Sequence, residues 1–163
     1  MYEIREGRLG KSVEASTVIP KGALILRGWG PTIRHRTRHS LQVDHDTHVI
    51  IRSPVELINH SCEPNCGVII RREVPCLEIH AMRRIERGEE LTTDYGTFEY
   101  EIEFMTGPCL CGTASCRGRI TGYRDLPEEL KASYGPYIAP YLREIDAGIT
   151  RSSQPVAAHA VSR

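Results

Sequence analysis

Short apolar runs alternate with polar breaks along most of the chain, a pattern typical of a mainly β protein. The run ALILR, bracketed by Gly22 and Gly28, predicts a buried strand. The segments CGVII and LEIHAM predict a strand pair joined by the polar connection RREVP. Runs of this kind predict strands at 23–27, 39–46, 47–53, 66–70, 77–82 and 91–95.

The pattern becomes helical near the C-terminus. The segment 127–135 (PEELKASYG) predicts a helix, because a proline opens its first turn, two glutamates lie near its positive end and Gly135 stops it. A second short turn or helix is expected within 136–146. The last stretch, 147–163, is small and polar, which predicts disorder. We therefore expect a mainly β domain with a short helical appendage at 123–146.

Composition narrows the function classes. With 163 residues, 40% of them hydrophobic, the chain has the size and apolar content of one domain. Its 21 basic and 21 acidic residues balance, which argues against a protein that coats nucleic acid or membranes. The basic run at 34–39 (RHRTRH) is accordingly interpreted as a solvated loop. No secretory signal or membrane-spanning run is visible, so we expect a soluble intracellular protein, cytoplasmic or nuclear.

Six cysteines in such a protein favour a metal site over disulfides. Three of them form a C-x-C-x4-C knuckle around Gly112: Cys109, Cys111 and Cys116. A structural zinc ion takes four tetrahedral ligands, so a distant cysteine must supply the fourth. The spacing leaves three candidates: Cys62, Cys66 and Cys76. The alternatives are packed thiols without a metal, or a redox centre, which the absence of a C-x-x-C motif disfavours.

Two further segments carry polar residues that folding does not require. The segment 57–69 (LINHSCEPNCGVI) crowds polar and conformationally special residues behind a short apolar run, which indicates a site. The run 98–104 (FEYEIEF) alternates with period two, so an extended chain would place Glu99, Glu101 and Glu103 on one face. That face could recruit a basic peptide, or it could simply be solvated.

Three segments, in order, resemble the signature motifs of the SET-domain protein lysine methyltransferases: NHSCEPN (59–65), GEELTTDYG (88–96) and CLCGTASCRG (109–118). A weaker likeness covers LGKSVEAS and the following VIPKGALI, which are similar to the family's glycine loop and next strand. The resemblance implies a SET domain at 1–107, with small curved β-sheets and a pseudoknot that threads the first two motifs together. A zinc-binding post-SET segment would follow at 108–122.

The resemblance also implies a site, with S-adenosylmethionine as cofactor and a structural zinc ion. Cofactor binding would fall to Gly10, Lys11, Ser12, Val13, Asn59, His60, Tyr95 and Arg117. Tyr95 would also be the catalytic residue, and Thr93 would line the substrate channel. Zinc would be bound by Cys62, Cys109, Cys111 and Cys116. Arg117 would begin a lid over the cofactor.

The chain departs from the family pattern at several of these points. Ser12 replaces the second loop glycine, and Glu56 and Leu57 stand where the family usually has Arg-Phe. Thr93 replaces a Phe or Tyr, which predicts a roomier channel and hence higher methylation or a bulkier acceptor. The insert between Gly30 and the NHSC motif is short, which leaves the wall of the substrate groove undefined.

These features together predict an S-adenosylmethionine-dependent methyltransferase that acts on the ε-amino group of a protein lysine, with histone tails among the candidate substrates. We expect no membrane partner and no direct nucleic-acid binding. One alternative is an N-methyltransferase of a small amine or a non-histone carrier. Another is a catalytically silent binding module that keeps cofactor and zinc.

Overall fold

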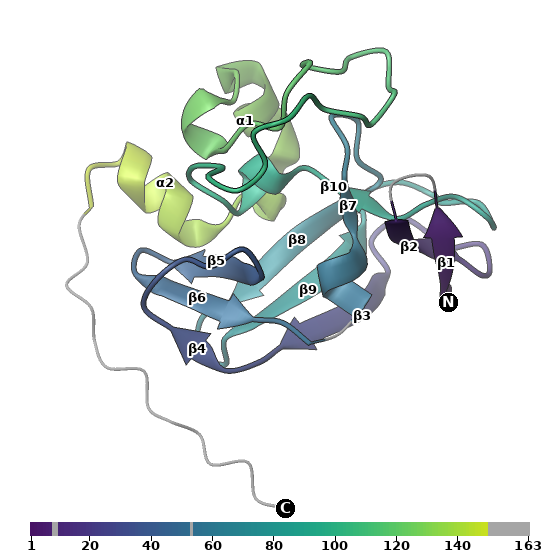
Figure 1. Ribbon diagram of the computed structural model, residues 1–163, viewed down its shortest axis with the longest axis horizontal. Coiled ribbons are helices and arrows are strands. Elements are labelled where there is room, and N and C mark those ends of the chain that lie inside the picture. Colours follow the sequence, from purple (N-terminus) through teal and green to yellow (C-terminus); the bar gives the residue numbers. More distant parts are fainter. Residues whose placement is uncertain (8–9, 53, 150–163) are drawn as a thin grey trace, which may run out of the picture.

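The computed structural model describes residues 1–7, 10–52 and 54–149. It confirms a mainly β architecture, in which several small sheets surround one core and two short helices lie on one side (Figure 1). In the part of the chain that the structure describes, no helix is long and apolar enough to cross a membrane.

The largest sheet contains three antiparallel strands in the order β3-β9-β8: Leu24–Trp29, Cys76–Ala81 and Cys66–Arg71. The predicted pairing of CGVII with LEIHAM is confirmed, with Val68 opposite Ile79 and Ile70 opposite Leu77. All four of these side chains are buried, which makes this sheet one wall of the core.

A second sheet has the order β4-β6-β5: Thr32–Ile33, Thr47–Ile50 and Ser40–Asp44. The two strands predicted within 39–53 are therefore confirmed, and they turn at the expected acidic break. The run 34–39 is the loop that joins β4 to β5. Most of its side chains are exposed, but Arg36 is half-buried.

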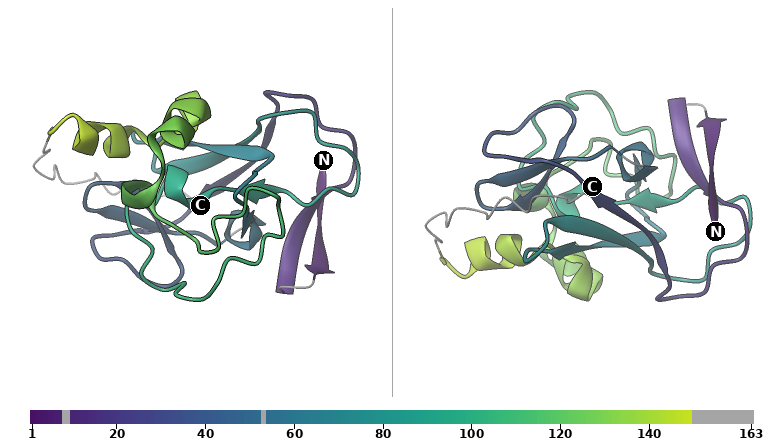
Figure 2. Two further views of the ribbon diagram at one scale, coloured as in Figure 1. Left: turned by 90° about the horizontal axis from the view of Figure 1, so that it is seen from above. Right: turned by 90° about the horizontal axis from the view of Figure 1, so that it is seen from below.

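The N-terminus forms a hairpin that lies at the opposite end of the molecule from α2 (Figures 1 and 2). Strand β1, Tyr2–Gly7, pairs antiparallel with β2, Gly10–Ala15. The cofactor loop expected at 10–13 is thus the first part of a strand. Only Gly10 there has a backbone conformation that favours glycine, with φ of 104°.

The two motifs expected to form the pseudoknot lie side by side. Strand β7, Asn59–His60, pairs in parallel with β10, Thr92–Thr93, and the Ser61 amide donates to the Thr93 carbonyl at 2.9 Å. The strand predicted at 91–95 is only these two residues long. It ends because the chain then enters a 3₁₀ turn, η2, at Tyr95–Thr97. A similar turn, η1 at Pro54–Leu57, leads into β7.

The helical appendage is confirmed and belongs to the same core. It contains η3 at Tyr123–Asp125, α1 at Glu128–Tyr134, η4 at Gly135–Tyr137 and α2 at Pro140–Asp146. Tyr134 and Tyr141 are buried, and the Tyr137 ring covers Gly67 so closely that a Cβ there would lie 2.3 Å from it. Most of the tail predicted to be disordered, 150–163, lies outside the described residues.

The acidic face expected at 98–104 does not exist. The segment is not a strand, and Glu99 is buried, where it accepts a hydrogen bond from the Gln42 amide at 2.9 Å. Arg36 lies 3.7 Å from Glu99 and pairs with Glu103 at 2.6 Å. Alternation was misleading here because tertiary contacts, with the Gln42 amide and with Arg36 of a distant loop, surround Glu99 in the core.

Candidate active site and thiol cluster

Four cysteines from two distant segments meet at one point. The Sγ atoms of Cys62, Cys109, Cys111 and Cys116 all lie within 4.8 Å of one another. Those of Cys62 and Cys109 are 3.9 Å apart. A tetrahedral zinc ion with Zn–S bonds of about 2.3 Å separates its sulfur ligands by about 3.8 Å, so this donor set fits zinc.

Two polar groups contact the sulfur atoms of the cluster. The Arg117 amide donates to Cys62 Sγ at 3.4 Å, and the Thr113 hydroxyl lies 3.3 Å from Cys111 Sγ. Cys66 and Cys76, the other two candidates left open by the spacing, are buried on β8 and β9 and do not join the cluster. The knuckle therefore lies against the NHSC segment and not against the sheet β3-β9-β8, which is the central sheet of the fold.

Tyr95 and His60 link the paired strands β7 and β10, called the knot below, to the thiol cluster. The Tyr95 amide donates to His60 Nδ1 at 3.3 Å, and His60 Nε2 lies 3.4 Å from Cys62 Sγ. The two rings are in edge contact, with centroids 5.3 Å apart. Burial lowers the pKa of His60 to about 4, so the imidazole is neutral at physiological pH.

The Tyr95 hydroxyl has a fixed orientation. It donates to the Ile58 carbonyl at 2.9 Å, which leaves its lone pairs available to a ligand. Burial raises the pKa of Tyr95 to about 12, so the group remains a neutral hydroxyl at physiological pH. It can therefore donate and accept hydrogen bonds but does not act as a base.

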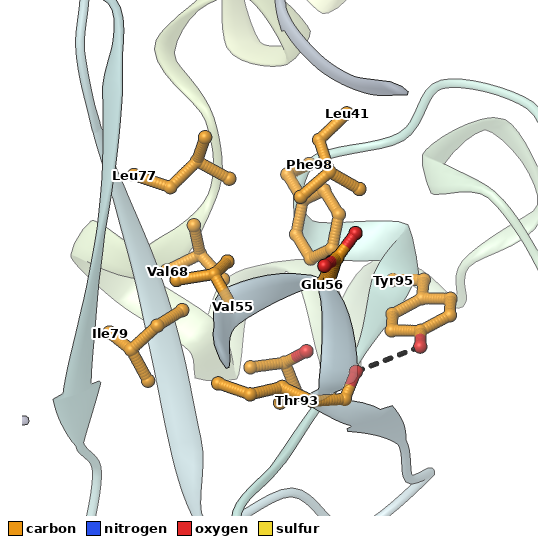
Figure 3. A pocket seen from close by; sticks show the side chains of 10 residues that line it. Leu41, Val55, Glu56, Val68, Leu77, Ile79, Thr93, Tyr95 and Phe98 are labelled. Atoms are coloured by element: carbon orange, nitrogen blue, oxygen red, sulfur yellow. Dashed lines mark hydrogen bonds between the residues drawn. The ribbon is translucent and has the colours of Figure 1, made fainter. Parts of the chain in front are cut away.

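A narrow cavity of about 40 Å³ lies beside Tyr95, and Thr93 lines it as well. Figure 3 shows the two side chains on adjacent parts of its wall, facing the aliphatic side chains of the central sheet. Its lining consists of Leu41, Val55, Glu56, Ile58, Val68, Leu77, Ile79, Thr93, Tyr95 and Phe98. Thr93 thus lines a cavity, and its role in a substrate channel stays a prediction.

The remaining residues expected to bind the cofactor are divided. Asn59 donates from its amide to Glu90 at 2.7 Å, at the surface. Strand β2 runs past the same segment, because the Leu91 amide donates to the Val13 carbonyl at 2.7 Å. Gly10 and Lys11 are exposed, whereas Ser12 and Val13 are buried. The side chain of Val13 thus packs in the core, and of residues 10–13 only Gly10 and Lys11 face solvent.

Asp94 is a buried hub that sequence analysis missed. Arg117 Nη2 donates to Asp94 Oδ1 at 2.9 Å and Nη1 lies 2.8 Å from Oδ2, so the side chain expected in the lid is held in an ion pair. Tyr134 from α1 donates to Oδ2 at 2.8 Å, and the Gly96 amide donates to Oδ1 at 3.1 Å. His60 Nδ1 lies 3.7 Å from the same carboxylate.

Asn65 lies in the segment 57–69 that the sequence indicated as a site, but no role was predicted for it. Its side-chain amide donates to the Glu90 carbonyl at 2.8 Å, and its oxygen accepts from the Thr92 amide at 3.0 Å. These two bonds fasten the segment after the thiol Cys62 to the start of β10. The signal was present in the sequence, since a second asparagine ends the NHSCEPN motif, but its partners are backbone groups and leave no pattern.

Comparison with known proteins agrees with this geometry. Residues 10–96 match the SET domain, more than half of the chain, and the chain therefore belongs to the SET domain family. The human histone-lysine N-methyltransferase SETD1B is 37% identical over 87 residues, which are 50% of this chain and 4% of that protein. A histone-lysine N-methyltransferase of Neurospora crassa, H3 lysine-4 specific, is 53% identical over 64 residues, 37% of this chain and 5% of that protein.

A solved structure shares the fold. It is that of KRYPTONITE in complex with mCHH DNA, an H3(1-15) peptide and SAH, with a TM-score of 0.61 and 25% sequence identity. The match covers 73% of this chain and 29% of that one. This chain thus spans only a small part of the length of the two methyltransferases that it matches in sequence.

Proposed function

We propose that this protein transfers a methyl group from S-adenosylmethionine to the ε-amine of a protein lysine. The observation that carries the proposal is the position of Tyr95, whose oriented hydroxyl lies on the wall of a narrow, mostly apolar cavity at the knot. Membership of the SET domain family and the names of the matched methyltransferases support it.

The residues around the knot fit the cofactor. Asn59 and Glu90 offer a donor and an acceptor at the surface, which is the combination that an amino-acid moiety requires. Neutral His60 and the aromatic ring of Tyr95 place no positive charge beside a sulfonium, and aromatic faces attract cations. When bound, S-adenosylmethionine would supply an electrophilic methyl group. Gly10 and Lys11 are the part of β2 that we assign to the same site.

Zinc would act as a structural ion. The four sulfur atoms fill a tetrahedral set, so they leave no position open for a reactive water. The ion would hold Cys62, two residues after His60, against the segment that continues into Arg117. We propose that it keeps the knot and the post-SET segment in register.

The cavity accounts for the chemistry that the chain itself must perform. Methyl transfer needs an unprotonated amine, aligned in line at about 3 Å from the methyl carbon. An apolar cavity removes water from an entering lysine and lowers its pKa, which favours the neutral amine. Tyr95 would orient that amine through its hydroxyl, and the Ile58 carbonyl would fix the hydroxyl in turn. No general base is required of the residues that line the cavity.

Thr93 suggested a roomier channel and a bulkier acceptor, but the cavity beside it has a volume of only about 40 Å³ and favours a slender aliphatic amine. A lysine side chain in a protein meets this condition, and so does a small primary amine, which keeps that alternative open to test. The H3(1-15) peptide in the structure of KRYPTONITE and the histone-specific names of the sequence relatives make a histone tail the first substrate to try.

The test is transfer of labelled methyl into a histone mixture and into a protein extract. We expect label on lysine, and a loss of at least about a hundredfold in kcat for Tyr95→Phe with little change in cofactor affinity by calorimetry. Tyr141→Phe is the matched control, because it also removes a hydroxyl bond to a backbone carbonyl, that of Phe98 at 2.6 Å, while Tyr141 itself does not line the cavity. Cofactor binding without label in any protein or amine pool would favour the silent binding module.

A further inference from the structure

We propose that Glu56 is a specificity-determining residue that recognises the positive charge of the acceptor amine at the entrance of the cavity. This inference rests on the proposed function, since it concerns the substrate of the same site. It adds a requirement that the methyl-transfer chemistry does not impose, namely that the acceptor arrives as a cation.

Glu56 is held at the cavity by the packing of its own turn. It belongs to η1, in which the neighbouring Val55 is buried so tightly against Gly28 that a Cβ on that glycine would lie 2.8 Å from Val55 Cγ2. Two residues later, the Ile58 carbonyl accepts the hydroxyl of Tyr95. One short segment therefore positions both the carboxylate of Glu56 and the hydroxyl of the proposed catalytic residue.

The carboxylate of Glu56 differs in charge from the other described residues that line the cavity. Among the described residues that line the cavity, Glu56 is the only charged one, and seven of the other nine are apolar. Its side chain is exposed, which places it at the rim, and Figure 3 shows it on η1 between Phe98 and Tyr95. A charge at the edge of an apolar cavity is the strongest local feature that an entering ligand meets.

Glu56 is also free to bind a ligand. Within residues 1–7, 10–52 and 54–149 its carboxylate forms no hydrogen bond or ion pair. The contrast is with Glu78, which is held by Arg27 and Arg71, and with Glu89, which is held by Arg83. Among the described residues, arginines pair with these other glutamates, but none pairs with Glu56.

The physics gives this carboxylate a role in binding rather than in the chemical step. A protonated amine that approaches an apolar cavity loses hydration before it gains any contact inside. An anion at the rim offsets part of that loss while the amine is still charged. Deeper in the cavity the amine must be neutral to react, so Glu56 no longer contributes there. Removing the charge should therefore raise KM and leave kcat nearly unchanged.

The test compares a cationic ligand with a neutral one of the same shape, without relying on turnover. Binding of Nα-acetyl-lysine methylamide and of its norleucine analogue would be followed by NMR shifts of residues that line the cavity. We expect the wild type to prefer the lysine compound by about twofold to fivefold, from the usual strength of an exposed charge pair. Glu56→Gln should abolish the preference, and Glu56→Lys should reverse it.

Glu73→Gln is the matched control, because Glu73 is exposed in the turn between β8 and β9 and does not line the cavity. It should keep the wild-type preference. An unchanged preference in Glu56→Gln would overturn the inference. So would a wild type that binds the two compounds equally.

Turnover separates this inference from the proposed function. With a lysine peptide as acceptor, Glu56→Gln should raise KM by the same factor of about two to five, as an exposed charge pair predicts, with kcat preserved. High salt should remove the difference between the two proteins. A wild type without methyl transfer, but with the charge preference intact, would refute the proposed function and leave the recognition of a cation by Glu56 standing.

Discussion

Asp94 offers the sharpest test of how the site is held together. Substitution of Asp94 by Asn keeps the shape of the side chain but removes its charge. The Arg117 guanidinium would then remain largely buried, with 13% of its side chain exposed, and would have no counter-charge in Asp94. The new amide group would also present hydrogens toward donors, because Arg117 and Tyr134 both donate to this carboxylate.

The expected loss can be estimated from the kind of interaction that is broken. Removing one partner of a buried ion pair costs about 3–5 kcal/mol, because the other charge stays uncompensated. Tyr134→Phe removes only one hydrogen bond to a charged group, for which about 1.5–3 kcal/mol is typical. A domain of this size has about 5–15 kcal/mol of stability in total. Asp94→Asn should therefore remove a large share of it and exceed Tyr134→Phe clearly.

The assay is urea unfolding followed by far-UV circular dichroism, at pH 7 and a fixed zinc concentration. Asp46→Asn is the control for the same chemical change at an exposed position and should stay within about 0.5 kcal/mol of wild type. The double variant Asp94→Asn with Arg117→Met should lose less than the sum of the single losses, since no buried charge is then left alone. A loss below about 1 kcal/mol for Asp94→Asn, or strict additivity, would refute this account of the hub.

Three further predictions follow from other contacts. Burial raises the pKa of Glu99 to about 7, so this group stabilises the fold below pH 4.5, and that contribution is lost as the pH rises through 7. Across this window the free energy of unfolding of Glu99→Gln should therefore rise by up to about 3 kcal/mol relative to that of wild type, as measured by urea unfolding at several pH values. Gly67→Ala should destabilise the protein by about 1–3 kcal/mol in the same assay through collision with Tyr137, and Tyr137→Ala should rescue part of the loss. Cys111→Ser should lower the zinc content found by metal analysis, whereas Cys76→Ser should not; full metal in the first variant would contradict the assignment.

The sequence predicted elements whose signals are local. The strands at 23–27, 66–70 and 77–82 and the helix at 127–135 follow from apolar runs and from end signals within a few residues. The hairpin β1–β2 had no such signal, because β1 is almost wholly exposed and is held by backbone pairing. Alternation at 98–104 gave the wrong answer for Glu99, whose partner Arg36 lies in another loop.

The residues of the candidate site likewise include some with a local signal in the sequence and others whose partners lie far along the chain. The fourth member of the thiol cluster could be sought in advance, because three thiols at close spacing leave one tetrahedral position to fill. Asp94 could not, since its partners Arg117 and Tyr134 lie 23 and 40 positions further along the chain. A single aspartate beside a tyrosine gives no indication of which distant groups it will bind.

The close contact between Gly67 and Tyr137 limits how far the chain can be truncated at its C-terminal end without loss of core contacts. The match to the SET domain ends at residue 96, and the thiol knuckle ends at Cys116, so either point would be a natural choice for a shortened expression clone. Either truncation would remove Tyr137, so the backbone of β8 at Gly67 would be exposed, and it would also remove the hydrogen bond from Tyr134 to Asp94. Tyr141 and Leu142 of α2 are also buried, and the Tyr123 hydroxyl donates to Asp146. We therefore expect the smallest folding unit to extend through α2 to Asp146, well past the segment by which the family is identified.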